Sequence, residues 1–252
     1  MISLTNLKKR ESGFTLLELL IVIAIIAILS IALVFMLNPA ETLKKARDAQ
    51  RISDLKSVKT ALGIMLTASS TPSLDNFGAI CHTTTTWGGA TTLNTDPQIA
   101  YSIDSGTPPT LAAGTYTAGA DAANSAYTAV TAASVRTGTS AGKVDGTGWI
   151  PVSLKGLTGG TPIASFPVDP VNTVVSSATT TDLVYRYACQ NGTSATVGAG
   201  RPSYIFEIDA RLESNAYTSE DNKMSKDGGD NDNLYESGNS LNLLPIGAAS
   251  GF

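Results

Sequence analysis

A single carboxylate, that of Glu18, lies near the start of the most apolar stretch of the sequence. Between Phe14 and Leu37, in "FTLLELLIVIAIIAILSIALVFML", it is the only ionisable side chain. An acidic residue at the centre of a lipid-spanning helix costs about 2.5–3.5 kcal/mol on insertion scales, so it usually has a partner or a role. The position of Glu18 therefore indicates a residue with a specific partner.

Four acidic side chains occur together in the turn-rich segment "NKMSKDGGDNDNLYESG". They offer the hard oxygen ligands that Ca²⁺ prefers, and they are Asp227, Asp230, Asp232 and Glu236. The spacing departs from an EF-hand, because the sixth position is not glycine and Leu234 stands at a ligand position. A solvated turn is the alternative, since Asp, Gly and Asn commonly form turns. The segment is a candidate calcium loop, with Asp227 and Asp232 as the first choices among its ligands.

Two further patterns resemble catalytic or metal motifs. "GTSAG" matches the nucleophile elbow G-x-S-x-G around Ser140, but no helix-forming sequence follows it and the only histidine, His82, precedes the serine. A stretch rich in Gly, Ser, Thr and Ala produces such a match by chance. His82 adjoins Cys81, yet no further His or Cys cluster completes a zinc site. Neither pattern predicts a catalytic residue, so we expect a protein that is not an enzyme.

The two cysteines, Cys81 and Cys189, are candidates for a disulfide. Both follow the apolar stretch, and an exported domain would meet an oxidising compartment. In the chain-entropy model, a bond that closes a loop of about 100 residues stabilises a fold by roughly 4–5 kcal/mol. The alternative is a pair of unbonded, buried cysteines.

The elements that must position these residues begin with the apolar stretch itself. As a helix, residues 14–37 would be about 36 Å long, enough to cross the roughly 30 Å hydrocarbon core of a bilayer. A cleaved secretory signal has a shorter apolar core, and a plain signal anchor gives no reason for Glu18. Residues 14–37 are therefore predicted to form a transmembrane helix.

Residues 38–66 continue as an amphipathic helix. Apolar side chains recur at three- and four-residue steps, and charged side chains such as Asp48 and Arg51 lie between them. The apolar positions are Leu43, Ala46, Ala49, Ile52, Leu55, Val58, Leu62 and Met65. The first proline of the chain, Pro39, predicts a kink or break in a helix that extends from about residue 14 to about residue 66.

The remaining chain divides into two zones. Residues 67–148 are rich in Thr, Ala, Gly and Ser, so we expect a long variable loop region with at most short strands. Residues 149–252 contain strand patterns, most clearly in "SYIFEIDARL". Its alternation predicts a half-buried antiparallel strand, with Phe206 and Ile208 on the core face and Glu207 and Asp209 on the opposite face.

Charge is unevenly distributed along the chain. The net charge is +2 for the first thirteen residues, +3 for residues 41–59 and −8 for all residues from 60 onward. A basic collar therefore flanks the lipid segment, and an acidic head follows it. No long basic run or aromatic-studded basic face points to nucleic acid as a partner.

The segment "KKRESGFTLLELLIVIAIIAIL" closely resembles the amino terminus of type IV prepilins and type II secretion pseudopilins. The resemblance implies a cytoplasmic leader, residues 1–13, which carries the basic residues Lys8, Lys9 and Arg10. It also implies that a membrane-embedded prepilin peptidase cuts between Gly13 and Phe14 and methylates the new amino terminus. Glu18 then takes the family's acidic position, where it neutralises the amine of Phe14 in its own chain or in a neighbouring one.

The same resemblance implies a fold, a location and partners. The fold would be α+β and type IV pilin-like, with the long helix packed on an antiparallel sheet in residues 149–252. The precursor would span the bacterial inner membrane once, with its head outside, before it joins a cell-surface or periplasmic filament. The partners would be other copies of the chain in a helical homopolymer, the inner membrane, the peptidase, an assembly ATPase, a platform protein and minor pilins or pseudopilins. No cofactor is required, although the acidic turn looks like the calcium loop of major pseudopilins.

Two questions stay open at the level of the sequence. The acidic turn is typical of a secretion pseudopilin, whereas the long Thr/Ala-rich insertion suits the exposed surface of a pilus. A protein of another class, a membrane-anchored extracytoplasmic binding or enzymatic domain that does not polymerise, would have the same anchor. The sequence also departs from many family members in the helix, because Pro39 stands about one turn later than the usual proline.

Overall fold

The computed structural model describes most of the helical part of the chain and the centre of its head. The described residues are 13–76, 81, 84–87, 90–93, 99–103, 110–111, 116–117, 135–137, 141–172, 177–178, 182–191, 204–244 and 246–247. They form two compact units, Met1–Leu43 and Lys44–Phe252, which are described separately. The predicted leader residues Lys8, Lys9 and Arg10 lie outside the described residues.

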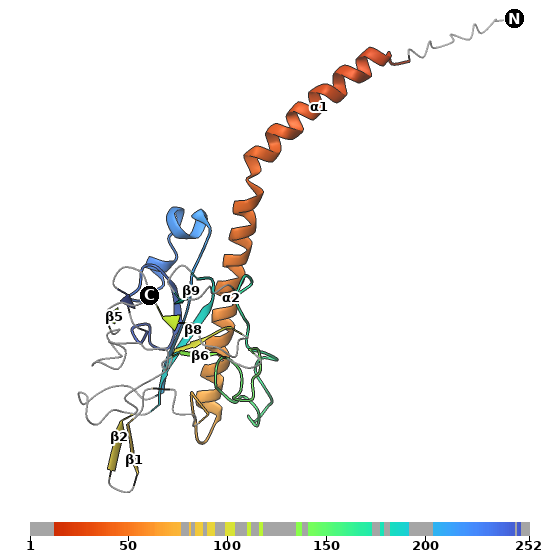
Figure 1. Ribbon diagram of the computed structural model, residues 1–252. Helices are drawn as coiled ribbons and strands as arrows, with labels where there is room; N and C mark the ends of the chain where they lie inside the picture. Colours follow the sequence, from red (N-terminus) through yellow and green to blue (C-terminus); the bar gives the residue numbers. More distant parts are fainter. Residues whose placement is uncertain are drawn as a thin grey trace, which may run out of the picture. The chain divides into compact units, whose positions relative to one another are not determined.

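Two helices form the first part of the chain, and a break separates them as predicted (Figure 1). Helix α1 spans Leu16–Leu37 and helix α2 spans Pro39–Ala68. Asn38 between them has a left-handed backbone, with φ at 38°, and its carbonyl accepts the first hydrogen bond of α2 from Glu41. Proline is well suited to the first position of a helix, because the N–H that it lacks would have no partner there.

The distal half of α2 packs into the core of the head. Leu55, Val58, Leu62 and Met65 from the predicted apolar stripe are buried. Ala46 and Ala49, which belong to the same stripe about two turns before Leu55, are exposed. The amphipathic pattern therefore serves two surfaces, one covered by the chain's own sheet and one open to solvent in the isolated chain.

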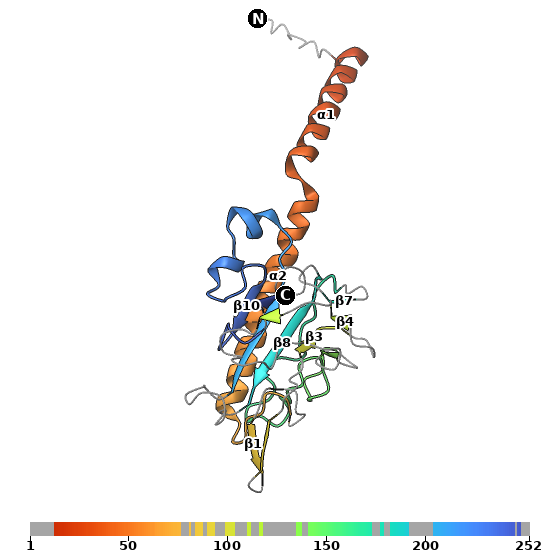
Figure 2. The ribbon, with the colours of Figure 1, turned by 60° about the vertical axis from the view of Figure 1, so that its left-hand side comes forward.

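The main sheet has five strands in the order β10-β9-β8-β3-β6. Its strands are β3 (Ile99–Tyr101), β6 (Val135–Thr137), β8 (Tyr185–Gln190), β9 (Ile205–Ala210) and β10 (Tyr235–Gly238). The first four strands in that order are antiparallel, and β6 pairs parallel to β3. Strands β10, β8 and β3 of this sheet are labelled in Figure 2. The α+β, pilin-like fold predicted from the sequence is therefore confirmed, although β3 and β6 come from the region that we expected to be mostly loop.

Shorter elements surround this sheet. Three small two-stranded sheets pair β1 (Thr84–Trp87) with β2 (Ala90–Leu93), β4 (Thr110–Leu111) with β7 (Ser177–Ala178), and β5 (Tyr116–Thr117) with β11 (Ile246–Gly247). A π-helix, η2 (Ala216–Glu220), and a 3₁₀-helix, η3 (Met224–Lys226), lie between β9 and β10.

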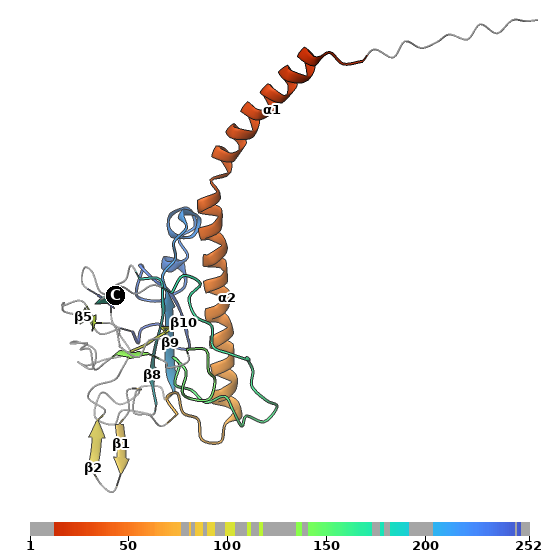
Figure 3. The same ribbon diagram turned by 45° about the vertical axis from the view of Figure 1, so that its right-hand side comes forward.

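The sheet is buried on both faces, which differs from the half-buried strand that we predicted. Phe206 and Ile208 pack in the core with α2, which runs along that face of the sheet (Figure 3). Glu207 and Asp209, expected on the outer face, are also buried, with exposures of 0% and 2%. The prediction that the side chains of β9 alternate between two faces is confirmed, but its polar side chains face other parts of the head instead of water.

A buried ionic network fastens α2 to the head. The Arg51 guanidinium donates to both oxygens of Asp169, at 2.6 and 2.9 Å, and to Asp48 at 2.8 Å. It also donates to Glu213, which Arg47 contacts through two further hydrogen bonds of 2.9 Å. Arg51 and Asp48 are fully buried, so part of the charged surface of this amphipathic helix is covered by the rest of the head.

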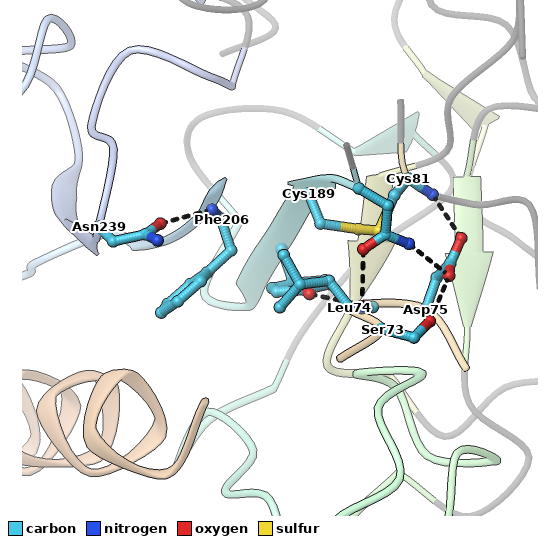
Figure 4. The surroundings of a disulfide bond; sticks show 9 residues. Ser73, Leu74, Asp75, Cys81, Cys189, Phe206 and Asn239 are labelled. Carbon is cyan, nitrogen blue, oxygen red and sulfur yellow. Dashed lines mark hydrogen bonds between the residues drawn. A yellow bond between two sulfur atoms is a disulfide. The ribbon is translucent and has the colours of Figure 1, made fainter. Parts of the chain in front are cut away.

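A disulfide joins Cys81 to Cys189 across 108 residues of sequence, which agrees with the expected pairing (Figure 4). A small hydrogen-bond clamp surrounds it. The side chain of Asn191 accepts from the Leu74 N–H at 2.9 Å and donates to Asp75 at 2.7 Å, and Asp75 accepts from the Cys81 N–H at 3.1 Å. The segment that follows α2 is thereby held covalently and by hydrogen bonds to the end of β8.

We predict that Arg51→Met destabilises the head by roughly 3–5 kcal/mol, because it leaves the carboxylates of the network buried without their guanidinium. Lys56→Met, on the exposed side of the same helix, is the matched control and should change the free energy of unfolding by about 0.5 kcal/mol or less. Urea unfolding of the full chain in detergent micelles measures both. Equal effects of the two substitutions would contradict the role assigned to the network.

Candidate functional sites

The amino-terminal site begins with a capping box at the start of α1. Thr15 is the N-cap, and its hydroxyl accepts from the Glu18 N–H at 3.2 Å. The Glu18 carboxylate accepts in return from the Thr15 N–H and hydroxyl, both at 2.9 Å. These reciprocal bonds satisfy two backbone donors that the first turn of a helix otherwise leaves without a partner.

This capping box identifies a residue that our sequence reasoning missed. Thr15 and Glu18 have the T-x-x-E spacing that marks a helix start, so the sequence already contained this signal. In the isolated chain, Thr15 is therefore the partner of the carboxylate that stood out in the apolar stretch. Gly13 and Phe14, the residues on either side of the expected cut, directly precede the cap, and the Phe14 side chain is 88% exposed.

Helix α1 presents an uncovered apolar surface. Every one of its described side chains is exposed, those of Leu16, Ile26 and Leu37 among them. By length and composition, Leu16–Val34 is the one span among the described residues that could cross a membrane. A helix that is apolar all round must be covered by lipid or by other protein, because water cannot solvate such a surface favourably.

The second candidate site is a group of three carboxylates at one edge of the main sheet. Each of Glu207, Asp230 and Glu236 offers one oxygen within 4.8 Å of the others. The register of β9 and β10 explains the approach, because Glu236 lies opposite Asp209 and therefore diagonally across from Glu207 on the same face. Glu207 and Glu236 are 0% and 3% exposed.

Glu207 uses only one of its two oxygens within the described part of the chain. Its Oε2 accepts from the backbone N–H groups of Leu243 and Leu244, at 2.6 and 2.7 Å. Its Oε1 is buried and has no hydrogen-bond partner there. Glu236 Oε2 accepts from the Asn231 N–H at 3.1 Å, so both glutamates are held in place by backbone donors.

The electrostatics of this site are unfavourable for negative charge. Burial raises the pKa of Glu207 well above its ordinary value, and the neighbouring Glu236 carboxylate raises it further. Burial likewise raises the pKa of Glu236. A shared proton or a bound cation would relieve the repulsion between these carboxylates.

The structure brings together only part of the predicted calcium loop. Asp230 and Glu236 belong to the carboxylate group, whereas Asp227 and Asp232, our first choices, do not. Asp227 instead accepts from the backbone N–H groups of Gly229 and Glu236, at 3.0 and 2.7 Å, and so closes the turn, while Asp232 is exposed. Glu207, twenty residues before Asp227, could not be identified from the loop sequence, because only the sheet register brings it to the turn.

His82 and Ser140 lie outside the described residues, so the structure does not position either side chain. Cys81, the neighbour of His82, is bonded to Cys189 and is therefore not a free thiolate ligand.

Comparison with known proteins adds one finding. Residues 8–34 match the family model of the prokaryotic N-terminal methylation motif, which is the prepilin-type signal of type IV pilins and pseudopilins. The matched range covers the basic cluster, the expected cut and most of α1. No significant match is found among curated proteins or among solved structures.

We predict that, in buffer with a chelator, the free energy of unfolding falls as the pH rises from about 5 to about 8. The native state raises the pKa values of Glu207 and Glu236 above the usual range near 4.5, so it binds more protons than the unfolded chain, and this stabilisation is lost as the pH rises through the native pKa values. Glu207→Gln should reduce this fall in the free energy of unfolding by roughly 1–3 kcal/mol. The substitution removes one carboxylate and keeps an oxygen that can accept from the Leu243 and Leu244 N–H groups.

Urea unfolding of the full chain in detergent micelles at several pH values measures this effect. Glu220→Gln, which changes an exposed acid, is the control and should leave the pH dependence unchanged. If the free energy of unfolding of Glu207→Gln depended on pH as that of the native sequence does, the raised pKa of Glu207 would not be a source of that dependence.

Proposed function

We propose that this protein is a structural subunit of a type IV pilus-like or type II secretion filament. The observation that carries the proposal is the prepilin-type signal at residues 8–34, which leads directly into an apolar helix with no covering in the isolated chain. The motif supports a pilin-like protein that a prepilin peptidase processes, and an inner-membrane-anchored precursor fits the apolar helix. The filament and its assembly machinery are the further step that we propose.

In this proposal, processing changes the partner of Glu18. Cleavage after Gly13 leaves Phe14 as the amino-terminal residue, and methylation leaves its amine cationic. The capping box holds the Glu18 carboxylate at the first turn of α1. Thr15, its capping partner, lies three residues before Glu18, and Phe14, which carries the new charge, lies four residues before it. A negative side chain is favourable at this end of the helix, where the macrodipole is positive.

The ion pair gives the subunits an axial register. A cationic amine or a carboxylate left alone in an apolar surrounding carries a penalty of several kcal/mol, so each strongly prefers a position that provides the other. When the apolar helices of successive subunits pack side by side, the amine of one Phe14 and the Glu18 of a neighbour define such a position. An assembly ATPase and a platform protein would supply the work of extraction from the membrane.

The exposed surfaces of the two helices suit this packing. Lipid covers α1 in the precursor, and helices of other subunits cover it in the filament. The exposed small residues Ala46 and Ala49 allow close approach of a neighbouring helix to the first part of α2. The distal half of α2 is already packed on its own sheet and would not change its contacts.

We also propose that the carboxylate group of Glu207, Asp230 and Glu236 binds Ca²⁺. Two features support a fit: the buried Oε1 of Glu207 has no hydrogen-bond partner in the described part of the chain, and a side chain at Gly229 would overlap the Glu236 carboxylate. A hard cation would compensate the mutual repulsion of the three groups. Through Glu207, it would also stabilise the docking of Leu243 and Leu244 on the sheet.

Calcium added at about pH 8 should stabilise the native sequence by about 2.7 kcal/mol at a hundredfold excess over Kd. Glu207→Gln should lose this gain, whereas Asp232→Asn should keep it, because Asp232 lies in the loop but outside the carboxylate group. Thermal unfolding with calcium or with EGTA measures the difference. The reverse ranking of the two variants would place the ion in the loop and exclude Glu207 as a ligand.

The filament proposal is tested by expressing the chain with a prepilin peptidase and an assembly system. We expect an intact mass that starts at Phe14 and carries one added methyl group. Glu18→Ala should be cut and methylated but form at least tenfold fewer filaments, because the Phe14 amine loses its partner. Ser30→Ala, whose hydroxyl bonds only to Ile26 O of its own helix among the described residues, is the control and should assemble normally.

Each result separates the alternatives. An uncut chain that starts at Met1 would refute processing and leave a membrane-anchored binding or enzymatic domain as the better account. A processed chain that forms no filaments with any variant would refute polymerisation alone. Normal assembly of Glu18→Ala would show that the subunits take their register from other contacts.

A further inference from the structure

A polar cleft lies at the carboxy-terminal end of α2, away from both sites described above. Its walls are the end of the helix, the segment that follows it to Asn76, and the loop residues 153–158. This loop belongs to the segment 141–172, drawn in green beside α2 in Figure 3. The cleft has a volume of about 500 Å³, within the range of roughly 300–1,000 Å³ that is typical of small-molecule sites.

The walls of the cleft are rich in hydroxyl groups. Six of its twelve described lining residues are serines or threonines; Ser70 and Thr71 come from the segment after α2, and Ser153 and Thr158 come from the loop. Met65, Ala68 and Leu157 supply an apolar floor. Hydroxyls both donate and accept hydrogen bonds, so this lining suits a ligand that does the same over most of its surface.

The helix end adds acceptors to this lining. The last carbonyls of an α-helix have no partner within the helix. In α2, the Met65 carbonyl accepts from the Ser69 N–H at 3.0 Å, and the last turn carries no basic side chain to compensate the others. These carbonyls favour a ligand with hydroxyl donors and disfavour an anion. Lys155, the cation at the cleft, already pairs with Asp145 at 3.3 Å, so it does not make the cleft a strongly positive site.

The remaining ligand classes fit less well. Among the described lining residues there is no carboxylate, histidine or cysteine to hold a metal ion, and no aromatic ring on which a nucleobase could stack. A ligand with many hydroxyls and an apolar C–H face matches both the rim and the floor. We propose that the cleft at the end of α2 binds a neutral saccharide.

The cleft is held in shape before any ligand arrives. Leu154 N donates to the Val144 carbonyl at 2.8 Å, and Gly160 N donates to the Leu157 carbonyl at 3.0 Å. Gly156, with φ at 85°, supplies the left-handed turn between them. Trp149 and Phe166 anchor the same segment in the core. A preformed site lowers the ordering cost of binding, because its loops need not be immobilised by the ligand.

The binding is expected to be weak. Without an aromatic platform, a few hydrogen bonds and a small apolar floor correspond to a Kd on the order of 1 mM. In a filament, many copies of the site would act together on a polysaccharide, and that gain rests on the proposed function. The site itself belongs to one chain, so a monomer suffices to test it.

Methionine-methyl NMR of the full chain in dodecylphosphocholine micelles provides the test, since this detergent has no sugar head group. The Met65 methyl reports on the floor of the cleft, and the Met224 methyl in η3 serves as an internal control. Maltotriose, chitotriose and lactose are the probes, each at about 10 mM, roughly tenfold above the expected Kd. We expect at least one of them to shift Met65 saturably and to leave Met224 unmoved.

Ser70→Ala combined with Ser153→Ala should weaken that binding at least fivefold, because one lost hydrogen bond corresponds to about a factor of five. Ser57→Ala is the matched control, because its hydroxyl bonds to Ser53 O within the exposed side of α2. An unmoved Met65 with all three sugars would overturn the proposal. A shift caused by sodium sulfate and not by the sugars would also overturn it and identify an anion site. Because the test uses monomers, neither failure would bear on filament formation.

Discussion

The main constraint on this protein is an apolar helix, α1, whose described side chains are all exposed in the isolated chain. The helix therefore requires lipid or other protein to cover it. This requirement accounts for the break at Asn38, which divides the membrane-type helix α1 from the helix α2 that packs in the head. Helix α2 can then bury its distal half against the sheet and leave its first turns available, without forcing α1 into the same packing.

Buried charge organises the head on both sides of the sheet, but the two clusters differ in how their carboxylates are paired. Between α2 and the rest of the head, short hydrogen bonds join the guanidinium groups of Arg47 and Arg51 to carboxylates of Asp48, Asp169 and Glu213. On the outer face, the Glu207 and Glu236 carboxylates approach each other, and burial raises both pKa values. In the first cluster, the carboxylates are paired with arginines, so the cluster serves to hold α2 to the rest of the head. In the second cluster, a proton or a bound cation would relieve the repulsion between the carboxylates, which is the physical basis of the calcium proposal.

Individual residues show where sequence reasoning succeeded and where it failed. The helical period located Leu55, Val58, Leu62 and Met65 in the core, and strand alternation located Phe206 and Ile208 there. The same alternation placed Glu207 on the outer face of a half-buried strand, and this was wrong, whereas the helical period gave no indication that Asp48 and Arg51 are buried. Their partners are distant in sequence: Asp169 lies 118 residues beyond Arg51, and Leu243 lies 36 residues beyond Glu207. A local pattern describes which side chains share a face, but it does not contain the groups that cover that face.

The sequence by itself determined the features that neighbours along the chain control. These are the apolar span, the prepilin-type signal, the break before Pro39, the alternation of β9 and the T-x-x-E cap that was present but overlooked. The tertiary structure alone decided which buried charges are paired, that Glu207 joins Asp230 and Glu236, and that the end of α2 meets the loop at Ser153 to form a cleft. The reason is physical, since hydrogen bonds within a helix or along a strand act over a few residues, whereas sheet register and loop packing bring together groups that no sequence spacing relates.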